Sequence, residues 1–275
     1  MIGGLDMKYK IGLSCGGAGK ELREETFKSC RDVGIEAMEI SVDKTKYGEI
    51  PYADLKKWSE QYGVRLWSYH MPFSVSMNID ISSVEKEIRD KTVQYFKELI
   101  GKASEIGISK FVVHPSCEPI AEEMRTEKIK YSKESLFQLA EYADNCNAVI
   151  AVENLPRTCL GRNSKEMLEL LSAHEKLRVC FDTNHVLKEN VVDFVKNVNE
   201  KIVTLHVSDC DFENERHWLP GEGKIDWKSL TTELDKANYN GVWMYEIGFK
   251  APDSIKRERD LTFIDFVENA KMIFH

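Results

Sequence analysis

The chain has 275 residues, of which 42% are hydrophobic, so it can bury a sizeable core in one large α/β domain or two small ones. Its formal net charge of -8 argues against nucleic acid as a partner, because binding a polyanion usually needs a basic face. The sequence has neither a secretory leader pattern nor ~18 consecutive apolar residues, so we expect a cytoplasmic protein that makes no membrane contact. The seven cysteines include no CxxC pair, and we expect neither a disulfide framework nor a thiolate zinc site.

Apolar, β-branched runs alternate with segments of helical period along the whole chain, which predicts βα units and a parallel sheet. The predicted strands are 10–14, 37–41, 64–70, 110–114, 149–154, 178–182, 202–209 and 241–247. The predicted helices are 20–33, 52–62, 83–106, 126–147, 164–174, 191–200, 227–238 and 254–273. Eight of each, with no linker between them, predict a single-domain (β/α)8 TIM barrel over residues 1–275, close to the ~250 residues typical of that fold. An open, doubly wound sheet is the structural alternative.

Several helix starts carry capping residues. Ser82 and Ser83 precede the third predicted helix, Asn163 the fifth and Asp226 the seventh. The charged segment 256–260 is interpreted as the solvent-facing side of the last helix.

Long irregular segments follow the third, fourth and seventh predicted strands, at 71–83, 115–125 and 210–225. In a barrel these loops lie over the mouth where ligands bind. The Gly-rich segment 16–21 lacks the P-loop spacing and is interpreted as a turn.

Six consecutive predicted strands finish in a side chain that can ligate a metal or transfer a proton. Parallel barrel strands point the same way, so we expect these side chains to meet at one mouth. They are His70, His114, Glu153, Asp182, His206 and Glu246.

Two positions before each of these residues, the side chain should also face the barrel interior. These mostly small residues predict a floor that leaves room for a ligand; they are Ser68, Val112, Ala151, Cys180, Thr204 and Met244. Carboxylates and imidazoles crowded above that floor would perturb one another's protonation unless a cation compensates. Oxygen and nitrogen ligands suit manganese, magnesium, cobalt, iron or zinc.

Short motifs at successive strand ends resemble one known family, the xylose-isomerase-like TIM barrels. That family includes ketose 3-epimerases, inositol-catabolic isomerases and dehydratases, and apurinic-site DNA endonucleases. The motifs span nearly the whole chain and are SYHMPF (68–73), VVHPS (112–116), VENLP (152–156), FDTNH (181–185), LHVSD (205–209), RHWLPGEGKIDW (216–227) and YEIG (245–248).

The resemblance to the epimerase-like branch implies a metal-dependent sugar isomerase or epimerase that acts through an enediolate on a ketose, sugar phosphate or polyol. It implies one divalent ion held by Glu153, Asp182, His206 and Glu246. Glu153 and Glu246 would be the acid/base pair, because proton transfer next to a carbonyl needs a base on the substrate and stabilisation of the charge that builds on oxygen. The residues expected to contact substrate are His70, His114, His185, Arg216 and His217. A homo-oligomer is a common default.

The endonuclease branch of the same family provides the alternative function, a multi-metal phosphodiesterase. That branch holds three metals through extra histidines, and this chain has matching candidates in His70, His114, His185 and His217, with Glu215 where the branch has Asp. The bulky Trp218 and the absence of a basic, intercalating loop set argue against DNA repair. A sugar-binding module without activity is a third class, disfavoured because the acid/base candidates are present. The loop 220–227 would either bring its backbone close to substrate or form an ordinary tight βα turn.

Overall fold

Eight parallel strands form the centre of the protein, whose computed structural model describes residues 8–16 and 22–274. The strands are β1 (Lys10–Ser14), β2 (Ala37–Ile40), β3 (Arg65–His70), β4 (Lys110–Val113), β5 (Val149–Glu153), β6 (Arg178–Asp182), β7 (Ile202–His206) and β8 (Val242–Tyr245). Their order is β7-β6-β5-β4-β3-β2-β1-β8, so nearly every strand lies beside its neighbour in sequence. Each strand starts within about one residue of its predicted start, but β7 ends at His206 and not at 209, and β8 ends at Tyr245 and not at 247.

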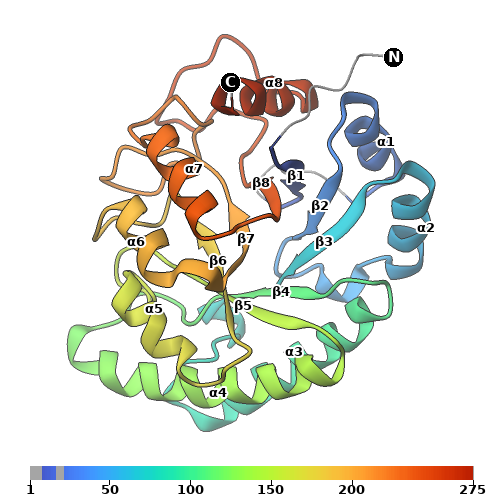
Figure 1. Ribbon diagram of the computed structural model, residues 1–275. Coiled ribbons are helices and arrows are strands. Elements are labelled where there is room, and N and C mark those ends of the chain that lie inside the picture. Colours follow the sequence, from blue (N-terminus) through green and yellow to red (C-terminus); the bar gives the residue numbers. More distant parts are fainter. Residues whose placement is uncertain (1–7, 17–21, 275) are drawn as a thin grey trace.

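The two ends of this sheet meet between β7 and β8. A parallel bridge joins Val207 to Tyr245, the amide of Val207 donates to the Met244 carbonyl at 2.8 Å, and the Glu246 amide donates to the Val207 carbonyl at 3.2 Å. The sheet is therefore a nearly closed TIM barrel, as predicted, and the open doubly wound alternative is excluded (Figure 1).

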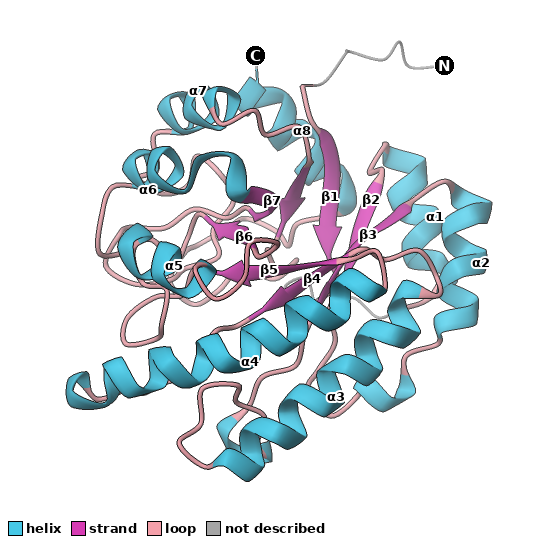
Figure 2. Cartoon of the chain, turned by 60° about the horizontal axis from the view of Figure 1, so that its bottom comes forward, coloured by secondary structure: helices cyan, strands magenta, loops and turns pink. Residues whose placement is uncertain are grey.

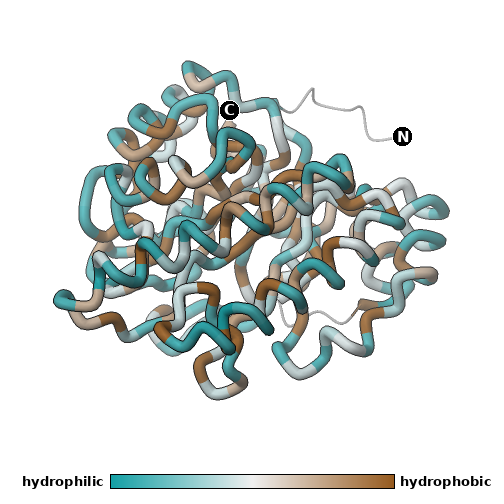
Figure 3. The backbone as a smooth tube through the Cα atoms, turned by 90° about the horizontal axis from the view of Figure 1, so that it is seen from below, coloured by the Kyte–Doolittle hydropathy of each residue, from teal (hydrophilic) through white to brown (hydrophobic). Residues whose placement is uncertain are grey.

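A ring of helices covers the outside of the barrel (Figure 1). The helices are α1 (Glu24–Val33), α2 (Tyr52–Tyr62), α3 (Lys86–Ser104), α4 (Arg125–Asn145), α5 (Ser164–Leu171), α6 (Val191–Val198), α7 (Trp227–Lys236) and α8 (Phe263–Phe274). The long helices α3 and α4 run side by side, as Figure 2 shows. Hydrophobic segments gather toward the middle of the molecule and hydrophilic turns lie outside (Figure 3), which is the distribution that burial of a single core requires.

The predicted helix boundaries need correction in places, most of all at the start of the last helix. The last helix begins at Phe263, not at 254, because Thr262 donates from its amide and its hydroxyl to the Asp265 carboxylate, both at 2.7 Å, and so marks the helix start there. The segment 256–260 is thus a loop and not part of the last helix, although four of its five residues are exposed as predicted. The exception is Arg257, whose side chain pairs with Glu222 at 2.7 Å. α3 begins at Lys86, which is later than the start predicted from Ser82 and Ser83 as capping residues.

The other two predicted caps agree with the structure. Asn163 accepts from the Glu166 amide at the start of α5, and Asp226 accepts from the Ser229 amide at the start of α7. The described cysteines form no disulfide. No helix among the described residues is both long and apolar enough to span a bilayer. Of the turn predicted at 16–21, residues 17–21 lie outside the described residues.

Inward-facing side chains fill the barrel beneath its carboxyl-terminal mouth. Val112, Ala151 and Cys180 pack together in one fully buried cluster, and Met244 belongs to a second. Thr204 accepts a hydrogen bond from the Trp67 indole at 3.0 Å. This small, weakly polar floor supports the functional groups above it.

Candidate functional site

Four strand-end side chains lie together at the carboxyl ends of β5 to β8. Each offers a ligand atom, and these atoms all lie within 4.8 Å of one another. The four are Glu153, Asp182, His206 and Glu246. They are the residues that the family resemblance implied as metal ligands, and the barrel topology unites them across more than ninety positions of sequence.

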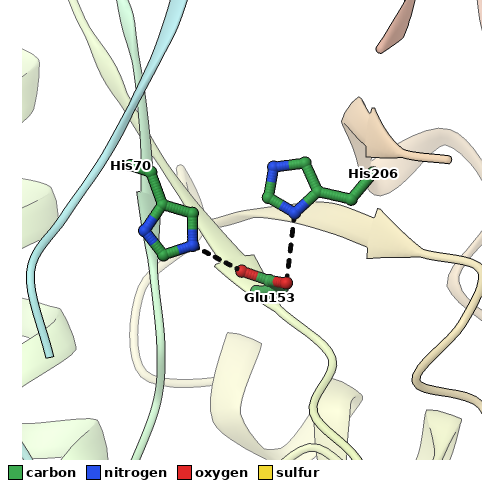
Figure 4. A group of neighbouring side chains, drawn as sticks. All are labelled: His70, Glu153 and His206. Carbon is green, nitrogen blue, oxygen red and sulfur yellow. Dashed lines mark hydrogen bonds and ion pairs between the residues drawn. The ribbon is translucent and has the colours of Figure 1, made fainter. Parts of the chain in front are cut away.

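Glu153 is shared with a second group. Its Oε1 lies 3.1 Å from His206 Nδ1, and its Oε2 lies 3.2 Å from His70 Nε2 (Figure 4). His70, Glu153 and His206 also lie close enough to bind one ion. His114 Nε2 reaches the same Oε2 at 3.1 Å. One carboxylate thus faces imidazoles on both of its oxygens.

Asp182 is positioned by the residues around it. The Asn154 side chain donates to the Asp182 carbonyl and accepts from the Asp182 amide, both at 2.8 Å, which ties the end of β5 to the end of β6. Asp182 Oδ1 accepts from the Asn184 amide at 2.7 Å. Asp182 Oδ2, however, is buried without a hydrogen-bond partner among the described residues. A buried charged oxygen without a partner is costly, and a cation at this point would satisfy it.

Burial and neighbouring charges shift the pKa values of the carboxylates in this site in opposite directions. Burial raises the pKa of Asp182 and that of Glu246. Burial also opposes ionisation of Glu153, but the charge of His206 and the hydrogen bond from His114 outweigh it and hold the pKa of Glu153 well below its usual value. Such divergent environments are typical of functional sites.

The pKa values of the histidines in this site also shift in opposite directions. Burial lowers the pKa of His114 to about 4, so this ring is neutral at pH 7. Burial likewise disfavours the charged form of His185, but the charge of Asp182 outweighs it and raises the pKa of His185 well above its usual value.

A cavity of about 720 Å³ opens above these residues, a volume suited to a small molecule. Phe73 forms part of its wall and stacks on His114, with ring centroids 3.8 Å apart. Asp182 and His206 are fully buried beneath it. The predicted site residues that line it are His70, His114, Glu153, His185, His217 and Glu246.

Arg216 is the predicted substrate contact that the structure places elsewhere. Its guanidinium pairs with Asp211 at 2.7 Å and lies over the Trp218 ring, so it is not part of the cavity wall. His217, the next residue, does reach the cavity, and its Nδ1 donates to the Glu246 carbonyl at 3.0 Å.

Two residues near the site were missed by the sequence analysis. Glu39 lies fully buried on β2 and contacts His206; an acidic residue inside an otherwise apolar strand was the signal. Arg157 lines the cavity between Glu118 and Glu215, with its Nη1 3.1 Å from the Glu215 carboxylate. It directly follows the VENLP motif, so its place in the mouth could have been predicted.

The glycines of the loop between β7 and α7 have a local explanation. The Asp209 carboxylate accepts hydrogen bonds from the amides of Gly221 and Ile225 and from the Trp227 indole, at 2.8, 3.1 and 2.9 Å. Gly223 packs against this carboxylate, and an added Cβ would collide with it. None of these loop residues lines the cavity, which favours the tight βα turn among the two interpretations of 220–227.

We therefore expect Gly223→Ala to destabilise the protein by about 1–3 kcal/mol, because the methyl group has no space beside Asp209 and the Cys210 carbonyl. Thermal unfolding followed by circular dichroism measures this loss. Gly48→Ala is the matched control, since a Cβ at Gly48 meets no heavy atom within 4 Å. Equal unfolding temperatures for the two variants would contradict the packing argument.

The fold and this cluster define a TIM barrel with an acidic, imidazole-rich mouth. The profile of the family described as "Xylose isomerase-like TIM barrel" matches residues 27–263. The chain belongs to this family.

Individual relatives come from both branches of the family. A probable endonuclease 4 from Aquifex aeolicus is 26% identical over 245 residues, covering 80% of this chain and 86% of that protein. A fructoselysine 3-epimerase from Escherichia coli O157:H7 is 27% identical over 120 residues, covering 42% of this chain and 44% of that one. The crystal structure of a D-tagatose 3-epimerase-like protein superposes with a TM-score of 0.80 at 24% identity, covering 96% of both chains, which shows a shared fold.

Proposed function

We propose that the protein is a divalent-metal-dependent sugar isomerase or epimerase that transfers a proton at the carbon next to a carbonyl group. The observation that carries this proposal is the placement of two carboxylates. Glu153 and Glu246 both line the cavity, and both contact His206 Nδ1, at 3.1 and 3.4 Å. Two carboxylates that share one small-molecule cavity can divide the roles of proton acceptor and proton donor.

The donor set suits a divalent cation. Three carboxylates and one imidazole offer ligand atoms within 4.8 Å of one another, and Asp182 Oδ2 has no hydrogen-bond partner among the described residues, with His185 Nδ1 3.4 Å away. Glu153, Asp182, His206 and Glu246 would hold the ion. When bound, it would offset the negative charge that develops on the substrate oxygens as the proton leaves.

The protein's own side chains would transfer the proton and contact the substrate. Glu153 or Glu246 removes the proton from carbon and the other returns one, which inverts that carbon if they act on opposite faces. His185 and His217, at the cavity wall, are placed to donate hydrogen bonds to substrate hydroxyl or carbonyl oxygens. Phe73 would contribute an apolar surface to the cavity wall. The epimerases among the relatives and the structural neighbours support this assignment.

Proton exchange tests the proposal directly. Protein supplied with Mn²⁺ and a panel of ketoses in deuterated water is expected to wash deuterium into the carbon next to the carbonyl, as detected by NMR. Metal-stripped protein should not exchange and should recover when Mn²⁺ is returned. Ligand-induced thermal stabilisation without exchange would instead identify a binding module.

A second candidate function, cleavage of abasic DNA, is favoured by the surroundings of Glu153. His70 and His114 lie on its Oε2 while His206 and His185 lie on its Oε1, at 3.1 and 3.4 Å. A carboxylate flanked in this way can bridge two ions, and multi-metal sites are suited to phosphodiester hydrolysis. The endonuclease relative supports this alternative.

The two functions separate by metal content and by substrate. The phosphodiesterase requires more than one metal per chain by plasma mass spectrometry and nicking of an abasic duplex, with an affinity that falls steeply with salt. We expect exchange of a ketose proton without nicking. Nicking without exchange would reverse the assignment.

A further inference from the structure

Glu39 is a buried carboxylate that the proposed proton transfer does not use. It lies on β2 at 0% exposure and is absent from the cavity wall, so it cannot contact a bound substrate. Carboxylates are almost never fully buried unless they are paired. Its partners therefore indicate what it does.

Those partners place Glu39 on the far side of His206. His206 Nε2 lies 3.0 and 3.1 Å from the two Glu39 oxygens, while His206 Nδ1 faces Glu153 at 3.1 Å and Glu246 at 3.4 Å. The Ser68 hydroxyl donates to Glu39 Oε2 at 2.7 Å and holds the carboxylate in place. The imidazole is thus held between Glu39 and the candidate metal ligands.

Both ring nitrogens of His206 face carboxylates, which accept but do not donate hydrogen bonds. With a cation among Glu153, Asp182 and Glu246, the Nδ1 lone pair would be needed for the cation, and the proton of the neutral ring would lie on Nε2 and be donated to Glu39. A histidine that donates its other ring N–H to a carboxylate is a more basic and better oriented metal ligand.

We propose that Glu39 is a positioning residue that fixes the orientation and tautomer of His206 for a divalent cation. This inference rests on the metal-binding part of the proposed function. It adds a residue from β2 to a site otherwise formed by the ends of β5 to β8.

The test measures metal binding instead of turnover. Glu39→Gln keeps the shape of the side chain but removes its charge, and its amide can present either a donor or an acceptor to Nε2. We expect it to weaken Mn²⁺ binding about 10–100-fold by isothermal titration calorimetry. Glu39→Asp should recover part of this loss, and Ser68→Ala should cause a smaller loss. The visible absorption of the Co²⁺-loaded protein should change in Glu39→Gln, because the imidazole that contributes to the ligand field is no longer held in one orientation.

Two controls separate positioning from general stability. Glu166→Gln removes a carboxylate of low exposure that pairs with Arg125 and does not line the cavity, and it should lower stability without changing Mn²⁺ affinity or the Co²⁺ spectrum. In a His206→Gln background, adding Glu39→Gln should change Mn²⁺ affinity by no more than about twofold, because the residue through which Glu39 acts is gone.

The outcomes are distinct. A folded Glu39→Gln protein with wild-type Mn²⁺ affinity and Co²⁺ spectrum overturns this inference alone. If Glu39→Gln does not fold, the same wild-type values in both Glu39→Asp and Ser68→Ala overturn it. A wild-type protein that binds no Mn²⁺ overturns the proposed function together with it.

Discussion

Glu246→Gln and Glu153→Gln are each expected to slow exchange of the substrate C–H proton about 10²–10⁴-fold while the ketose still binds. An amide keeps the size of the carboxylate and one oxygen, but it cannot accept a proton from carbon. Glu246 retains 14% side-chain exposure and Glu153 reaches the cavity wall, so both are accessible to a bound substrate. Deuterium wash-in measured by NMR at saturating Mn²⁺ gives the rate, and calorimetry gives ketose binding.

Metal occupancy must be measured beside these rates, because both residues are also candidate ligands. Glu122→Gln is the matched control: Glu122 is a largely exposed carboxylate that pairs with Arg162 on the surface. Its exchange rate should equal that of the unmodified protein. Wild-type exchange in either site variant would remove that residue from the acid/base pair.

Removal of the divalent metal is expected to lower the unfolding temperature, and Asp182→Asn to abolish that dependence. A ligand bound only to the folded state at 100 times its dissociation constant stabilises it by about 2.7 kcal/mol. The physical reason is the buried Asp182 oxygen, which lacks a hydrogen-bond partner among the described residues until a cation satisfies it. Differential scanning calorimetry with Mn²⁺ and with EDTA measures both effects.

The same carboxylate predicts a pH dependence for the metal-free protein. Burial raises the pKa of Asp182, so the folded state favours its protonated form. The stability it contributes is fully present below the unfolded pKa of about 3.9 and is lost as pH rises through the raised folded value. Metal-free Asp182→Asn should therefore be more stable than the unmodified protein at pH 7, and the difference should shrink toward pH 4.

The metal-removal prediction has its own contrary outcome. An Asp182→Asn protein that Mn²⁺ still stabilises fully would exclude Asp182 as a ligand.

Much of the fold could be predicted from the sequence, because hydrophobic periodicity is a local pattern. Strand positions, the caps at Asn163 and Asp226, and the strand-end placement of Glu153 and Asp182 all followed from short apolar runs and the residues that end them. The start of α8 did not follow. There, Thr262 donates to the Asp265 carboxylate and marks the helix start, while Arg257 pairs with Glu222 on another loop, and a charged segment alone does not reveal such a partner.

Side-chain direction in loops was the least predictable part of the site. Arg216 was expected over the substrate, but Asp211, five residues earlier, holds its guanidinium away from the cavity. Arg157 occupies the mouth instead, between two carboxylates from different loops. Pairings between loops depend on how the loops fold over each other, which no strand pattern specifies.

The sequence by itself determined that acidic and imidazole groups would end neighbouring strands, because alternation along a strand and the common direction of barrel strands follow from backbone geometry. Only the tertiary structure decided which atoms face one another. It placed Glu39 behind His206, left one Asp182 oxygen without a hydrogen-bond partner among the described residues and gave both Glu153 oxygens imidazole neighbours. These contacts depend on the stagger of the strands and on rotamers chosen during close packing, which are properties of the assembled barrel.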